Sequence, residues 1–185
     1  MQNDTFKKNI RQILELCGKL SRLIKVGVLT NYMKSKAGTI FLAGLIAGTL
    51  DILAAIFIYA ILLQKTTPIK ILQSIASGIF KKEAYNHSQM AWYGLGFHFI
   101  IALIFAWFYF ILYPYLTFLK KSALVSGFLY GIFVWIVMNL IVLPIVFPVL
   151  PAKHLDFPLI LSVLILIFCI GFPIAFITRK FYSFK

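Results

Sequence analysis

Four long apolar runs dominate the pattern of hydrophobic and polar positions along the chain, and shorter, mostly basic segments separate them. A helix that crosses a membrane needs about 20 mainly apolar residues. Backbone groups in lipid must bond internally, which favours helices, and the runs are too uniformly apolar for the alternating strands of a membrane β-barrel. The pattern therefore predicts an all-α integral membrane protein, a bundle of four transmembrane helices at residues 39–63, 91–113, 122–144 and 157–178.

Ahead of the first run, apolar residues recur at helical spacing over residues 5–29, and basic residues occupy the opposite side. This arrangement is typical of an amphipathic helix that lies on a membrane surface and contacts anionic lipids. A helix that docks on a partner protein is the alternative. We divide the chain accordingly into a basic N-terminal segment, residues 1–37, and a four-helix transmembrane domain, residues 38–180.

The connection between the first two spans, residues 66–89, contains one more periodic stretch. Pro68 suits the first turn of a helix. The apolar side of this helix is predicted to comprise Ile69, Leu72, Ile75 and Phe80. The stretch is too short to span a membrane, so we expect a short helix on the outer surface or a re-entrant one.

Proline and basic residues set the predicted ends of the last two spans. Prolines 144, 148 and 151 lack a backbone donor and clash with the preceding turn. The third helix is therefore expected to stop or kink near Leu143. Arg179 and Lys180 are expected to end the fourth helix.

The charge of the chain supports a membrane topology rather than nucleic-acid binding. The formal net charge is +13, but the basic residues lie between apolar runs, where anionic lipid head groups are the expected partners. Thirteen of the 18 Lys and Arg residues lie on the side that carries both termini. The positive-inside rule then places both termini in the cytoplasm.

Each predicted span contributes one polar side chain between the midplane and the outer third of the bilayer, as judged from 1.5 Å of rise per residue. These side chains are Asp51, His98, Asn139 and Ser162. Asp51 is the only charged residue between positions 39 and 63, and it shares a helix face with Gly44 and Gly48. Because ionisable groups at this depth normally face the bundle interior and have a partner, Asp51 and His98 are predicted to face each other.

Small residues at four-residue spacing indicate close helix packing. They are Gly44 and Gly48 in the first span, Gly94 in the second, and Gly127 and Gly131 in the third. In lipid such residues let helix backbones approach closely. Packing within one bundle is the simplest interpretation, and a homodimer formed through one of these faces is the alternative. The local likeness of "AGLIAG" to "SGFLYG" also hints at a two-plus-two duplication.

The predicted outer loops hold four scattered residues of the kinds that bind metals. They are Glu83, His87, His154 and Asp156. Their scatter favours no metal site, and one histidine within the spans is too few for the usual pair of axial haem ligands, so no cofactor is expected. The chain also lacks a phosphate-binding glycine loop, an HExxH motif and a nucleophile elbow, so nothing indicates an enzyme.

Several stretches together resemble a group of small uncharacterised bacterial inner-membrane proteins described as YagU-like. These stretches are "AGLIAGTLDILAAIF", "ILQSIASGIF", His98, "YGIFVWIVMNLIVLP" and "GFPIAF". The resemblance covers roughly residues 38–178. It implies a bacterial origin and a four-helix inner-membrane fold, and it brings no activity or site.

Two functions fit these observations. The first is permeation of a small solute, or proton-linked transport, in which Asp51 and His98 form the coupling pair and Asn139 lines the path. The second is a non-catalytic scaffold or accessory subunit in which the polar layer only fixes helix packing. Contact of the polar layer with a cofactor, and a lipid- or quinone-modifying enzyme that uses the outer loops, are further alternatives.

Overall fold

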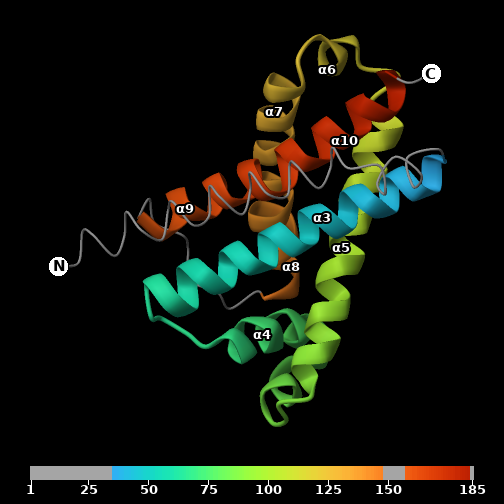
Figure 1. Cartoon of the computed structure of the whole chain (residues 1–185). Coiled ribbons are helices and arrows are strands. Elements are labelled where there is room, and N and C mark those ends of the chain that lie inside the picture. The colour runs from blue at the N-terminus through green and yellow to red at the C-terminus, as the bar shows by residue number, and fades with distance from the viewer. Residues whose placement is uncertain (1–34, 148–156, 184–185) are drawn as a thin grey trace.

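The computed structural model describes residues 35–147 and 157–183 (Figure 1). Four helical stretches in these ranges are long and apolar enough to cross a membrane, namely Lys36–Leu62, Met90–Leu112, Ala123–Val146 and Leu159–Ser183. The prediction of an all-α protein with four helices of spanning length is therefore confirmed. The predicted amphipathic helix at residues 5–29 lies outside the described residues, as do His154 and Asp156.

The first spanning stretch begins with a capped helix and ends in a π-helical segment. Helix α3, Lys36–Ala55, starts where the Ser35 side chain accepts a hydrogen bond from the Gly38 N–H, at 3.0 Å. This cap satisfies an N-terminal donor and explains why the helix begins before residue 39. The π-helix η1, Ile56–Leu62, completes the stretch.

A short helix follows the first span, as predicted, and small or polar side chains form its fully buried contact. Helix α4, Pro68–Phe80, is capped by the Thr67 side chain, and the 3-10 helix η2, Lys81–Tyr85, continues from it. Its buried residues are Gln73, Ala76 and Ser77, whereas Ile69 is half exposed. Leu72, Ile75 and Phe80, three of the four residues of the predicted apolar side, are partly buried. Small side chains take the buried positions because α4 packs closely on the second spanning helix.

The remaining elements follow in order. They are α5 (Met90–Leu112), α6 (Thr117–Lys121), α7 (Ala123–Ile136), the π-helix η3 (Val137–Val142), α8 (Leu143–Val146), α9 (Phe157–Ile165), the π-helix η4 (Leu166–Gly171) and α10 (Phe172–Ser183).

A stop or kink was predicted near Leu143, and the third spanning helix ends three residues further on, at Val146. Pro144 lies two residues after the end of η3, and Pro173 lies two residues after the end of η4 in the fourth span. A proline clashes with the carbonyl of the preceding turn and lacks a donor. A π-helical turn relieves both effects by shifting the local hydrogen-bond pattern, so each helix passes through its proline.

The fourth spanning helix also extends beyond its predicted end. Arg179 and Lys180 lie within α10, which continues to Ser183, and the Ser183 hydroxyl donates to the Arg179 carbonyl oxygen at 2.9 Å. Long basic side chains can remain in a helix near a membrane surface because their charged ends reach toward water. The two basic residues therefore do not end the helix.

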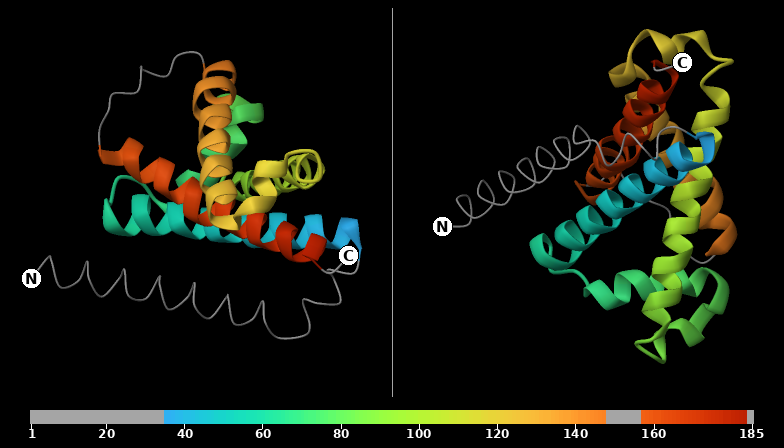
Figure 2. Two further views of the ribbon diagram at one scale, coloured as in Figure 1. Left: turned by 90° about the horizontal axis from the view of Figure 1, so that it is seen from above. Right: turned by 45° about the vertical axis from the view of Figure 1, so that its right-hand side comes forward.

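Spanning helices that follow one another in the chain pack in pairs that cross steeply (Figures 1 and 2). Helix α3 packs against α5, and α7 packs against η4 and α10. Contacts of α3 with α10 and η4 join the two pairs. The start of α3, the ends of α5 and α10, and α6 lie at one end of the molecule, at the upper right of Figure 1, and α4 lies toward the other end (Figures 1 and 2).

Buried tyrosines tie the second and third spanning helices together. The rings of Tyr109 and Tyr130 meet edge to face, with centroids 4.7 Å apart. The Tyr109 hydroxyl donates to Ser126 Oγ at 3.0 Å, and the Tyr130 hydroxyl donates to the Phe105 carbonyl oxygen at 2.6 Å. Because buried phenols need partners, these bonds fix the relative position of α5 and α7.

Candidate functional site

The glycine face of α3 sets the register between the first two spanning helices. A methyl group added at Gly44 would lie 2.7 Å from Leu103 Cδ2 and 2.9 Å from Leu103 Cα. A methyl group added at Gly48 would lie 3.0 Å from Ala102 Cβ and from Phe99 Cδ1. Both glycines therefore allow a close backbone approach, as their spacing predicts. The next turn of the same face carries Asp51.

Asp51 and His98 meet across this contact. His98 Nε2 lies 4.0 Å from Asp51 Oδ2, and the two side chains keep 12% and 17% of their surface exposed, for His98 and Asp51 respectively. The glycine contacts explain this meeting. Gly44 faces Leu103 and Gly48 faces Phe99, so the next turn of α3 lies beside position 98 of α5. The structure thus brings together the two ionisable side chains that the sequence assigns to the spans.

The His98 ring has a second and shorter contact, with the backbone of α3. His98 Nε2 lies 2.8 Å from the Gly48 carbonyl oxygen. A carbonyl oxygen only accepts hydrogen bonds, so Nε2 carries the hydrogen and donates it. The imidazole is therefore held by Gly48, and the Asp51 carboxyl group, one turn further along α3, lies 4.0 Å away, too far for a direct hydrogen bond.

The other two residues of the predicted polar layer lie on the second helix pair. Ser162 Oγ accepts a hydrogen bond from Trp135 Nε1 at 2.9 Å and donates to the Leu159 carbonyl oxygen at 2.7 Å. The Asn139 side-chain amide donates to the Trp135 carbonyl oxygen at 3.0 Å. The four predicted residues therefore form two groups, one between α3 and α5 and one between the third and fourth spans.

Trp135 joins the second group, and sequence reasoning missed it. A tryptophan in an apolar run is usually read as an interfacial anchor or as packing, yet its N–H needs a partner when it is buried. Trp135 lies four residues before Asn139, so the two share a helix face. This four-residue spacing was the sequence feature that could have indicated that Trp135 belongs with the polar residues.

Glycines also bring the second helix pair together. Methyl groups added at Gly127 and Gly131 would lie 3.0 Å from Phe172 Cα and 2.5 Å from Ile167 Cα. Gly171, in "GFPIAF", meets the Gly127 carbonyl oxygen so closely that no side chain fits there. Sequence reasoning missed Gly171 because it has no glycine four residues away. In each helix pair, two glycines lie four residues apart on one helix, and a polar contact follows them in the next turn. The two pairs therefore share one arrangement.

Gly94 serves a different contact from the other predicted glycines. It lies on α5 in line with His98, but a methyl group there would overlap the Leu72 carbonyl group of α4. The Gln73 side-chain amide donates to the His87 carbonyl oxygen at 3.0 Å and joins α4 to the turn before α5. Gly94 therefore fixes α4 on the second spanning helix and takes no part in the contact with α3.

Glu83 and His87 do not form a metal site with each other. Their four-residue spacing would align them on an α-helix, but Glu83 lies in the 3-10 helix η2 and His87 lies in the turn beyond it. Both residues are exposed. Within residues 35–147 and 157–183, no group of three or more His, Cys, Asp or Glu residues could hold a metal ion.

Comparison of the chain with protein-family models, with curated proteins and with solved structures finds no significant match. The four apolar helices by themselves indicate a multi-pass membrane protein.

Proposed function

We propose that the protein conducts a proton, or a small solute linked to a proton, through a bacterial inner membrane, with Asp51 and His98 as the coupling pair. The observation that carries this proposal is the meeting of two ionisable side chains, 4.0 Å apart and largely buried, within two helices of spanning length. Ionisable groups in such positions are unfavourable in lipid and typically mark ion or proton pathways.

The two groups differ in how firmly they are held, and this difference suggests their roles. Gly48 fixes the His98 ring through a hydrogen bond at 2.8 Å, whereas Asp51 Oδ2 lies 4.0 Å from the same ring nitrogen. A change at Asp51 therefore leaves the hydrogen bond that holds the ring intact. In this proposal Asp51 gains and loses the proton, and His98 is the partner held in a fixed position. The π-helix η1 begins five residues after Asp51, and π-turns are frequent at functional sites.

The proposed location rests on charge and on likeness. Basic residues concentrate on the side that carries both termini, so the positive-inside rule puts that side in the cytoplasm. The resemblance to YagU-like proteins supports a bacterial inner membrane. The basic segment at residues 5–29 would rest on anionic lipids of the inner leaflet.

A second candidate function is a membrane scaffold or accessory subunit. The hydrogen bond from His98 to the Gly48 carbonyl oxygen favours it, because that bond fixes helix register whether or not a proton moves. In this case residues 5–29 recruit a partner membrane protein, or a second copy of the chain, and the polar groups only hold the bundle together.

A ligand screen separates the two candidates. We expect at least one solute to raise the unfolding temperature of the purified protein in a pH-dependent manner, because a ligand that binds the native state stabilises it. Asp51→Asn and His98→Gln should abolish the shift. Thr49→Ala should retain it, because Thr49 is exposed and its hydroxyl bonds only within α3, to the Leu45 carbonyl oxygen.

Opposite results would favour the scaffold. If Asp51→Asn and His98→Gln keep every solute-dependent and pH-dependent property of the protein while deletion of residues 5–29 abolishes its role in cells, the transport proposal fails.

A further inference from the structure

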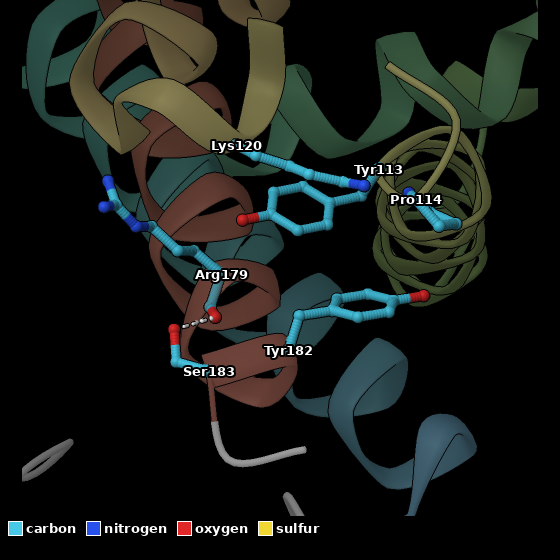
Figure 3. Close-up of a pocket in the computed structure, with 6 residues that line it drawn as sticks. All are labelled: Tyr113, Pro114, Lys120, Arg179, Tyr182 and Ser183. Carbon is cyan, nitrogen blue, oxygen red and sulfur yellow. Dashed lines mark hydrogen bonds between the residues drawn. The ribbon is translucent and has the colours of Figure 1, made fainter. Parts of the chain in front are cut away.

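One pocket lies at the end of the molecule where α5 and α10 finish. It has a volume of about 380 Å³, within the range of small-molecule sites. Its lining comes from the turn after α5, from α6 and from the last turn of α10, and consists of Tyr113, Pro114, Lys120, Arg179, Tyr182 and Ser183 (Figure 3). Segments far apart in the chain thus form one site, away from Asp51 and His98.

The aromatic side of the pocket is well ordered by packing. Tyr113 is buried, and its ring stacks on that of Tyr182 with centroids 5.0 Å apart and planes 25° apart. Phe110 packs against Tyr182 as well, with centroids 5.2 Å apart. The Ser183 hydroxyl donates to the Arg179 carbonyl oxygen, which holds the last turn of α10 in place. These contacts hold the last turn of α10, which carries Arg179, against the end of α5.

Lys120 and Arg179 supply the charge of the pocket. Figure 3 shows the two cationic groups on opposite sides of the Tyr113 ring, with the Tyr113 hydroxyl directed toward the Arg179 side. Within the described residues the carboxylates belong to Asp51 and Glu83. Asp51 lies beside His98, and Glu83 lies in η2, before the opposite end of α5. No acidic side chain of the described chain is therefore near enough to neutralise the pocket.

We propose that this pocket binds a phosphate group, carried by an anionic phospholipid or by a small soluble phosphate compound. The guanidinium group of Arg179 matches phosphate oxygens with paired donors. The ammonium group of Lys120, on a flexible side chain across the Tyr113 ring, adds a second and mobile point charge to the same pocket. Phenol hydroxyl groups add neutral donors. The pocket lies at the ends of two helices of spanning length, the level at which lipid phosphates are found. The lipid is therefore the favoured source.

The neighbouring lysine provides a matched control. Lys121 lies next to Lys120 on α6 and is also exposed, but it does not line the pocket. General attraction between a basic surface and anionic lipid would involve Lys120 and Lys121 equally. A phosphate site formed by the pocket residues would depend on Lys120 and not on Lys121.

The test is binding of defined phosphates to the full-length protein in detergent, followed by native mass spectrometry and by thermal unfolding. The probes are phosphatidylglycerol, phosphatidylcholine and inorganic phosphate. We expect phosphatidylglycerol to bind in preference to phosphatidylcholine. Arg179→Gln and Lys120→Gln should each weaken phosphatidylglycerol binding by about fivefold, the usual effect of one basic residue near a lipid surface. Arg179→Lys should weaken it less than Arg179→Gln, and Lys121→Gln should leave it unchanged.

The outcomes divide clearly. Binding of inorganic phosphate that depends on Arg179 and Lys120, without preference for phosphatidylglycerol, supports the site and assigns it to soluble phosphates. Equal loss in Lys120→Gln and Lys121→Gln overturns the proposal, because it shows general surface charge. Unchanged binding of both probes in Arg179→Gln and Lys120→Gln also overturns it. Both residues lie at the surface end of helices, so helical circular dichroism should confirm that each variant folds.

Discussion

Gly94→Ala is expected to destabilise the protein strongly, whereas Gly96→Ala, two residues further along the same helix, is not. A methyl group at Gly94 would overlap the Leu72 carbonyl group, a backbone group that cannot move without shifting α4. A methyl group at Gly96 would meet nothing within 4 Å. Overpacking of this kind costs about 3 kcal/mol, which for a chain of this size corresponds to roughly 6–12 °C in unfolding temperature.

Thermal unfolding in detergent, followed by helical circular dichroism, measures both variants. Gly96→Ala should keep the wild-type unfolding temperature or exceed it slightly, because alanine favours a helix over glycine by about 1 kcal/mol. Equal behaviour of the two variants would show that α4 does not pack on α5 through Gly94.

His98→Ala is expected to destabilise the protein more than the double variant Asp51→Asn, His98→Ala. Removal of the imidazole leaves the Asp51 carboxylate without its partner, and loss of one member of a buried ion pair typically costs about 3–5 kcal/mol. We expect about 2–3 kcal/mol here, because both side chains keep some exposure. Asn at position 51 carries no charge, so removal of His98 from the Asp51→Asn variant leaves no buried carboxylate without a partner and costs less unfolding free energy.

A double-mutant cycle measures this coupling directly. The unfolding free energies of the wild type, the two single variants and the double variant should give an interaction energy of about 1 kcal/mol or more. Thr49→Ala, combined with His98→Ala in the same way, should give additive effects, since Thr49 bonds only within its own helix. Additivity of Asp51→Asn and His98→Ala would mean that the two groups do not interact.

The spacing of small and polar residues was sufficient to predict the contact of Asp51 with His98. Asp51 follows Gly48 by three residues, so it must share the face that packs closely. An antiparallel neighbour then brings the polar residue at similar depth opposite to it. Both steps depend only on the geometry of a helix, so the residue spacing is enough to make this prediction.

The separation of the polar layer into two groups was not predictable in the same way. Depth along a helix assigns Asn139 and Ser162 to the level of Asp51, but it does not say which helices are neighbours. The partner of Ser162 is Trp135, on the third spanning helix. Likewise Gly94 lies in line with His98, yet it contacts α4, because the position of α4 depends on packing between helices rather than on spacing within one.

The passage of two helices through proline also depended on local hydrogen bonding that the residue pattern does not show. Pro144 predicted a stop or a kink, since a proline in an α-helix removes a donor and clashes with the preceding turn. The structure instead places π-turns before Pro144 and Pro173. Those turns satisfy the backbone in a way that composition alone does not indicate.

Proton flux into vesicles tests the central claim that Asp51 and His98 carry a proton across the membrane. Purified protein is reconstituted in liposomes that contain a pH-sensitive dye, and a potassium gradient with valinomycin sets the membrane potential. The wild type and Thr49→Ala should change the internal pH faster than protein-free liposomes, and Asp51→Asn, inserted in equal amount, should fall to the protein-free rate. A wild-type rate in Asp51→Asn, or no flux above protein-free liposomes in the wild type, would contradict the account.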